Sequence, residues 1–147
     1  DPHLLRWVHL AELDSFLTAH DRHGDRPLVG DERDRYVAEA AVVARALGAE
    51  SPPESEAELR HQIRGFRAEL GGTRAARDAA RYLLVSPPLP LAGRAPYALI
   101  GAAAVALMPA WTRLPLRLPW LPISEAVAAR PAGEVVTRTL RWAMPPR

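Results

Sequence analysis

The chain has 147 residues, 48% of them hydrophobic, which is enough for one domain with an apolar core. It contains no cysteine, so disulfides, thiolate metal sites and a cysteine nucleophile are excluded. The net charge is only +2, and the 19 cationic residues, all arginine, alternate with acids along the chain, which argues against a nucleic-acid partner.

A first helix is expected over residues 2–19, because Asp1 can cap it and Pro2 suits its first position. One stripe of this helix is expected to face inward. It contains Leu5, His9, Glu12 and Phe16, with Val8 and Leu13 beside it. Residues 20–30 read as a polar loop. No basic-then-apolar leader opens the chain, so a cytoplasmic location is expected.

Three further helices are expected before residue 86. The second starts with Asp31 as its cap and stops at Gly48. Its expected inward residues are Tyr36, Val37, Ala40, Ala41, Ala44 and Leu47. Ser55 and Glu58 form a capping box for the third, which is expected to end at Gly71 and Gly72. The expected apolar stripe of the third contains Leu59, Ile63, Phe66 and Leu70. Thr73 is the expected cap of the fourth, which runs to about Val85.

Proline punctuates the rest of the chain. Residues 87–90 are expected to be extended, and Pro96 is expected to open an apolar helix over residues 97–108. The uncharged run 95–112 is shorter than the roughly 20 apolar residues of a membrane-spanning helix. A fully buried core helix is the preferred interpretation, and contact with a membrane or a hydrophobic partner is the alternative.

A Pro-rich segment with Trp111 and Trp120 follows, and it is expected to cover the core or to form a surface for a partner or lipid. A last helical region is expected from Ser124 to about Ala143. No alternating β-branched run is present. The sequence therefore predicts an all-α fold: an irregular multi-helix bundle forming a single domain over residues 1–147, with the Pro-rich, Trp-containing segment near its C-terminus.

His9 is the sharpest candidate site residue. It could contact haem or a metal, or handle a proton, inside a helical pocket. The structural alternative, a core histidine bonded to a carbonyl or a nearby side chain, is the better one for His9 taken alone. Glu12 lies one turn on and is interpreted as a hydrogen-bond partner of His9 or as a charge at the edge of that face.

A second cluster of polar residues lies in the expected loop after the first helix. It consists of His20, Asp21, His23 and Asp25. Solvent exposure is the default for such a loop, and zinc would need three or four converging ligands. No nucleophile elbow and no phosphate-binding glycine loop is present, so no catalytic residue and no metal site is predicted.

Segments along nearly the whole chain resemble a known family. The segment Asp1, Pro2, Leu4, Leu5, Trp7, Val8 and His9, followed by Asp14, Ser15, Phe16 and Leu17, resembles a signature of the MpaB/latex-clearing-protein (rubber oxygenase) family. Segments 34–39, 58–60, 79–84, 87–90, 96–99 and 138–143 are similar to relatives from high-GC bacteria. The resemblance covers nearly the whole chain.

The resemblance implies an all-α oxygenase that depends on haem b and acts on an apolar substrate, which in some relatives is a polyisoprenoid. It places His9 and Phe16 on the wall of the haem pocket, with His9 not the axial ligand. In the family, the axial histidine and an Arg-x-x-x-Thr motif lie upstream of the Asp-Pro-x-Leu-Leu segment. No threonine of the printed sequence follows an arginine at that spacing. The chain is therefore expected to be the C-terminal portion of a haem oxygenase-like domain that alone is inactive and does not bind haem stoichiometrically.

Two other functions stay open from the sequence. One is a non-catalytic helical remnant or interaction module of the same fold, with self-association through an exposed apolar face. The other is a metal hydrolase built on His9, Glu12, His20 and His23, which would lose activity in the His9→Ala variant.

Overall fold

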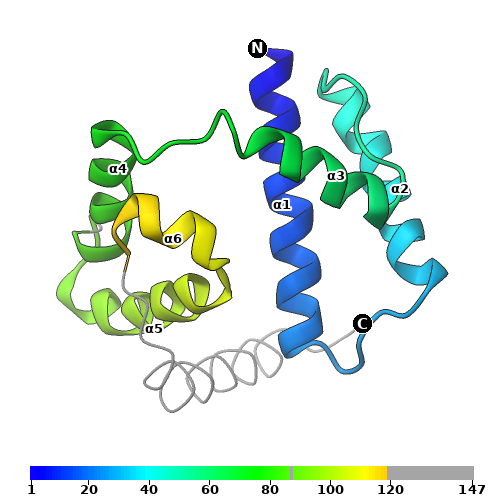
Figure 1. The fold of residues 1–147 in the computed structure, drawn as a ribbon. Helices are drawn as coiled ribbons and strands as arrows, with labels where there is room; N and C mark the ends of the chain where they lie inside the picture. The colour runs from blue at the N-terminus through cyan, green and yellow to red at the C-terminus, as the bar shows by residue number, and fades with distance from the viewer. Residues whose placement is uncertain (87, 119–147) are drawn as a thin grey trace. The chain divides into compact units, whose positions relative to one another are not determined.

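The computed structural model describes residues 1–86 and 88–118 (Figure 1). All regular structure in this part of the chain is helical, as the sequence predicts. It forms six helices, and the sixth, Ala110–Leu116, falls in the Pro-rich segment where no helix was expected. Trp120 and the helical region expected from Ser124 lie outside the described residues. The chain divides into two compact units, Asp1–Leu70 and Gly71–Arg147, which are described in turn. A single domain over residues 1–147 stays a prediction.

Helix α1, Pro2–His23, begins as its sequence predicts. The Asp1 carboxylate accepts hydrogen bonds from the N–H groups of His3 and Leu4, at 2.9 and 3.3 Å, which satisfies two donors that the first turn leaves free. The helix continues one turn beyond residue 19, until the Gly24 N–H bonds to the His20 carbonyl at 2.7 Å. The expected loop over residues 20–30 is therefore shorter than predicted.

The buried face of α1 differs from the expected one. Leu10, Leu13 and Leu17 are buried, at i, i+3 and i+7. The predicted inward stripe was wrong, because Leu5 is 39% exposed and Phe16 is 56% exposed. At about 100° per residue, the two stripes lie roughly a quarter turn apart on the helix. Since α1 carries apolar residues on both, spacing alone cannot choose between them.

Helix α2, Asp31–Ala46, has Gly30 as its N-cap, so the expected cap at Asp31 was wrong by one residue. Glu32 reaches back instead and accepts from the Val29 N–H at 3.1 Å. The helix stops just before Gly48, whose φ of 91° suits glycine. Its inner face holds Val37, Ala41 and Ala44, whereas Leu47, expected inside, is exposed.

Helix α3, Glu56–Phe66, confirms half of its capping box. The Ser55 hydroxyl accepts from the Glu58 N–H at 3.2 Å, but the Glu58 carboxylate accepts from the Glu54 N–H, at 2.8 Å, rather than from Ser55. Leu59, Ile63 and Phe66 are buried as predicted. The helix ends at Phe66, well before the glycine pair that was expected to stop it.

The first unit is a three-helix arrangement in which α1, α2 and α3 contact one another (Figure 1). Leu10, Val37 and Leu59, one from each helix, are among its most deeply buried side chains. Burial of each contributes about 1.5–3 kcal/mol relative to exposure. The core of this unit therefore depends on a few interlocked aliphatic residues.

The second unit contains α4, Arg74–Val85, which contacts both α5, Leu91–Leu107, and α6, Ala110–Leu116. Thr73 caps α4 as predicted, since its hydroxyl accepts from the Ala76 N–H at 3.1 Å. Helix α5 begins one turn before Pro96, which was expected to open it. A side chain at Gly72 would place its Cβ 2.0 Å from the Pro115 carbonyl oxygen, so only glycine fits there.

The expectation of a fully buried α5 was wrong for the described residues. Val105 is buried, but Leu91 is 81% exposed, Leu99 46% and Ile100 49%. Among the described residues no single helix is long and apolar enough to cross a membrane. Residues Gly93–Leu107 and Ala110–Leu116, which meet at an angle of 120°, meet the length and composition requirement only as a bent pair.

Candidate functional site

His9 lies on α1 at the border between the buried leucine face and the exposed apolar stripe. Its Nε2 is buried and has no hydrogen-bond partner among the described residues. An unpaired buried polar atom costs free energy, so such an atom is a candidate contact for a ligand. This observation makes His9 the best-supported site residue of α1.

The electrostatic surroundings keep the His9 imidazole neutral. Burial lowers the pKa of His9 below its ordinary value of 6.5, and the nearby Glu12 carboxylate only partly opposes that shift. The hydrogen bond expected from Glu12 is not formed at the His9 Nε2, and Glu12 acts on His9 as a nearby charge, which was the other interpretation. A neutral imidazole keeps one ring nitrogen as a donor and the other as an acceptor.

Phe16 lies seven residues after His9, two turns along the same side of α1. Leu5, Val8 and Phe16 are all more than a third exposed, and together with His9 and Glu12 they form what we call the outer face of α1. The outer face combines apolar side chains with one neutral imidazole and the exposed acidic side chain of Glu12. Chemically, it suits an apolar ligand that bonds to His9 and lies away from the charge of Glu12.

Sequence reasoning missed the surroundings of Arg6, one turn before His9. The Arg6 guanidinium lies 5.2 Å from the centre of the Phe66 ring, in cation–π contact. Trp7 and His3 also contact that ring, with centroids 5.5 and 4.7 Å away. The Arg6 Nε is buried with no hydrogen-bond partner among the described residues. The aromatic residues at i−3 and i+1 of Arg6 were the available signal.

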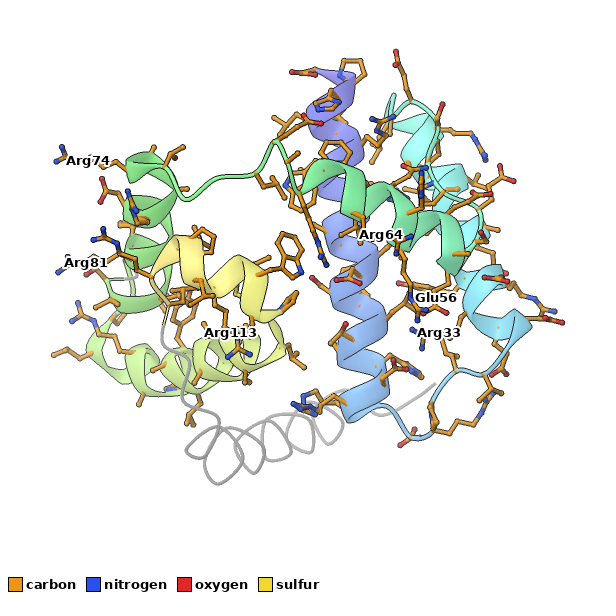
Figure 2. The ribbon with its side chains drawn as sticks, in the orientation of Figure 1. Arg33, Glu56, Arg64, Arg74, Arg81 and Arg113 are labelled. Atoms are coloured by element: carbon orange, nitrogen blue, oxygen red, sulfur yellow. The ribbon has the colours of Figure 1, made fainter. Side chains whose placement is uncertain are left out.

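The sequence also did not reveal a network of charges that joins the three helices of the first unit. Arg33 of α2 bonds to Asp21 of α1 at 2.8 Å and to Glu56 of α3 at 2.8 Å, and Arg33 and Glu56 point toward each other (Figure 2). Arg60 reaches the same Glu56 carboxylate at 2.5 Å. The hydrogen bond that Arg33 donates to Glu56 raises the pKa of Arg33. We call Asp21, Arg33, Glu56 and Arg60 the charge network.

Asp14 lies beside the charge network. Burial raises the pKa of its carboxyl group, and the positive charges of Arg60 and Arg67 partly offset that effect. Asp14 is therefore a partly buried acid whose pKa is raised by burial, and the attraction to Arg60 and Arg67 limits that rise.

The second polar cluster of the sequence is split by the structure. His20, Asp21 and His23 belong to the last turn of α1, and Asp21 pairs with Arg33 of the charge network. Within residues 1–86 and 88–118, no three His, Asp or Glu side chains come together as a metal-binding group. A hydrolase centre built on His9, Glu12, His20 and His23 gains no support from this part of the chain.

Comparison with known proteins identifies the family of the chain. The family model described as "ER-bound oxygenase mpaB/B'/Rubber oxygenase, catalytic domain" matches residues 1–144. No curated protein and no solved structure matches the chain.

Proposed function

Because the chain belongs to the MpaB/rubber oxygenase catalytic-domain family, we propose that it forms part of a haem-dependent oxygenase acting on an apolar substrate. In this proposal His9 and Phe16 line the wall of the haem pocket, as the resemblance implies. The observation that carries it is the buried, unpartnered Nε2 of His9 at the edge of an exposed apolar face.

The residues of the outer face fit haem in three respects. A neutral imidazole does not oppose an apolar macrocycle, and its unpaired Nε2 is free for one hydrogen bond. Phe16 offers an aromatic surface, and Leu5 and Val8 would exclude water from the same side. When bound, haem supplies the iron chemistry that activates dioxygen. This helix would hold and orient the group from one side.

A helical interaction module is the second candidate. It is favoured by the many exposed large apolar side chains in both units, among them Leu5, Phe16, Val42, Val43 and Leu91. Single exposed apolar residues are ordinary, but contiguous ones indicate a binding surface. On this alternative the outer face would bind another polypeptide and no haem.

The test uses the full-length product of the gene, purified after expression with a haem supply. We expect one haem b per chain and a Soret band that shifts in the His9→Ala variant without loss of haem. His61→Ala, an exposed histidine of α3, is the matched control and should leave the band unchanged.

Each result decides a separate part of the proposal. A full-length protein that binds no haem contradicts haem dependence and favours the interaction module. Complete loss of haem in His9→Ala would make His9 a ligand of the iron. An unchanged Soret band in that variant would remove His9 from the pocket. Dioxygen uptake with a polyisoprenoid emulsion, lowered by Phe16→Ser, tests the apolar substrate class.

A further inference from the structure

Helix α5 is apolar on every side, yet much of its surface is exposed. Its residues from Ala95 to Leu107 include no charged side chain. The exposed ones are Ala95, Pro96, Ala98, Leu99, Ile100, Ala102 and Ala104. One side contacts α4, where a Cβ at Gly101 would lie 3.4 Å from Leu84. A helix that is hydrophobic all round belongs in a protein core or in lipid. The described part of the second unit covers only one side of it.

The length of α5 decides how it could meet lipid. Its 17 residues span about 25 Å at 1.5 Å per residue, less than the roughly 30 Å of a hydrocarbon core. The chain turns by 120° into α6 after Leu107, so the pair forms an apolar hairpin and not a straight span. This geometry suits shallow insertion at the surface of a bilayer.

Arg113, the one charged residue between Ala95 and Leu116, bonds to backbone carbonyls at the bend of the hairpin. Its Nε donates to the Met108 carbonyl at 2.7 Å and its Nη2 to the Ala106 carbonyl at 2.9 Å (Figure 2). These carbonyls lie at the end of α5, where the last backbone carbonyls have no N–H partner within the helix. Arg113 is only 5% exposed. The pairing of these two carbonyls lowers the cost of bringing the bend into an apolar environment.

The charges around the hairpin are of one sign. Residues 79–118 contain four arginines and no acidic residue. With Arg113 turned inward, the exposed Arg94 near the start of α5 and the exposed Arg117 after α6 flank the apolar segment. Arginines at the ends of an apolar segment can reach lipid headgroups, and each strengthens binding to an anionic surface.

We propose that α5 and α6 form a lipid-docking hairpin that inserts shallowly into an anionic membrane surface, with Leu91 and Leu99 among the inserted side chains and Arg94 and Arg117 at the headgroups. The charge complementarity selects an anionic bilayer over a second copy of the chain, whose matching surface would carry the same positive charges. The inference does not depend on haem.

The test is flotation of the full-length protein with phosphatidylcholine vesicles, with and without phosphatidylglycerol. We expect binding to the anionic vesicles at low salt that weakens as salt is added. Leu99→Asp should lower the partition coefficient by roughly tenfold or more, since it replaces an inserted leucine with a charge. Arg94→Glu should lower it by a similar factor on anionic vesicles.

Matched controls lie on α2 in the first unit. Val43→Asp and Arg35→Glu make the same chemical changes at exposed positions and should leave the partition unchanged. Far-UV circular dichroism confirms that all variants stay folded. Three outcomes overturn the proposal: no flotation of the wild type, equal flotation with neutral vesicles, or a Leu99→Asp variant that changes only the oligomeric state in solution. The last would assign α5 to contact between copies.

Discussion

Glu56 is the residue through which the charge network can be tested most directly. Its carboxylate bonds to Arg33 at 2.8 Å, and their side chains are only 19% and 17% exposed. It also accepts from Arg60, which is 63% exposed. Replacement by glutamine keeps the size of the side chain and one acceptor oxygen but removes the charge, so Arg33 retains only its ion pair with Asp21. The cost should therefore come mainly from the Arg33 pair.

The size of that cost follows from the burial of the pair. Exposed ion pairs contribute about 0–1 kcal/mol and breaking fully buried ones costs about 3–5 kcal/mol, so a pair that is four-fifths buried should contribute about 2 kcal/mol. For a unit of 70 residues, Asp1–Leu70, this lowers the melting temperature by roughly 8–16 °C. Urea and thermal unfolding followed by far-UV circular dichroism measure both quantities.

Glu54→Gln is the matched control for this change. Glu54 lies two residues before Glu56 and pairs with Arg45, but its side chain is 58% exposed and that of Arg45 is 48% exposed. Its loss should cost less than about 0.5 kcal/mol. If the two glutamine variants unfold with the same free energy, burial does not strengthen the network and the argument fails.

The remaining predictions concern two titrating groups and one cap. His9 binds fewer protons folded than unfolded because burial lowers its pKa, so its neutral form stabilises the fold above pH 6.5 and that stability is lost as the pH falls through the folded pKa. The difference in unfolding free energy between wild type and His9→Gln should therefore change sharply below pH 6.5, and a flat difference would contradict this. The pH dependence due to Asp14 has the opposite sign, because the pKa of its carboxyl group is raised above 3.8. The wild type should lose stability relative to Asp14→Asn as the pH rises above 3.8 through the folded pKa. Urea titrations at several pH values measure this loss. Thr73→Ala should cost about 1 kcal/mol and loosen α4, seen as faster amide hydrogen exchange in its first turn, whereas unchanged exchange would mean that the hydroxyl bond to Ala76 contributes nothing.

Local signals in the sequence predicted the helices well. Asp1, Ser55 and Thr73 cap the helices that they were expected to cap, because a capping side chain acts within three residues and needs no tertiary information. The all-α class followed from the same signals. The ends of the helices were predicted less accurately than their starts. Helix α1 runs one turn further than expected, since nothing in residues 20–23 breaks a helix.

Which face of a helix is buried was harder to predict, and this affects the candidate site. Helix α1 has two apolar stripes, and the partners that cover Leu10, Leu13 and Leu17 come from α2 and α3. Their choice depends on tertiary packing, which spacing does not encode. The assignment of His9 and Phe16 to a pocket wall stays a prediction, and the two differ in burial: the Nε2 of His9 is buried, whereas Phe16 is 56% exposed. In the charge network, Arg33 pairs with Asp21 and Glu56, 12 and 23 positions away, and these pairs leave no local pattern. Only the pair of Glu56 with Arg60 has the i, i+4 spacing of a helix.

The close approach of Gly72 to Pro115 has a consequence for how related sequences can vary. Adjacent glycines look interchangeable in a sequence, yet a Cβ at Gly71 would meet nothing within 4 Å, whereas one at Gly72 would meet the Pro115 backbone. Position 71 can therefore accept a larger residue without a steric clash. Gly72 and the backbone of α6 can change only together, so we expect any relative with a larger residue at this position to carry a displaced or altered α6.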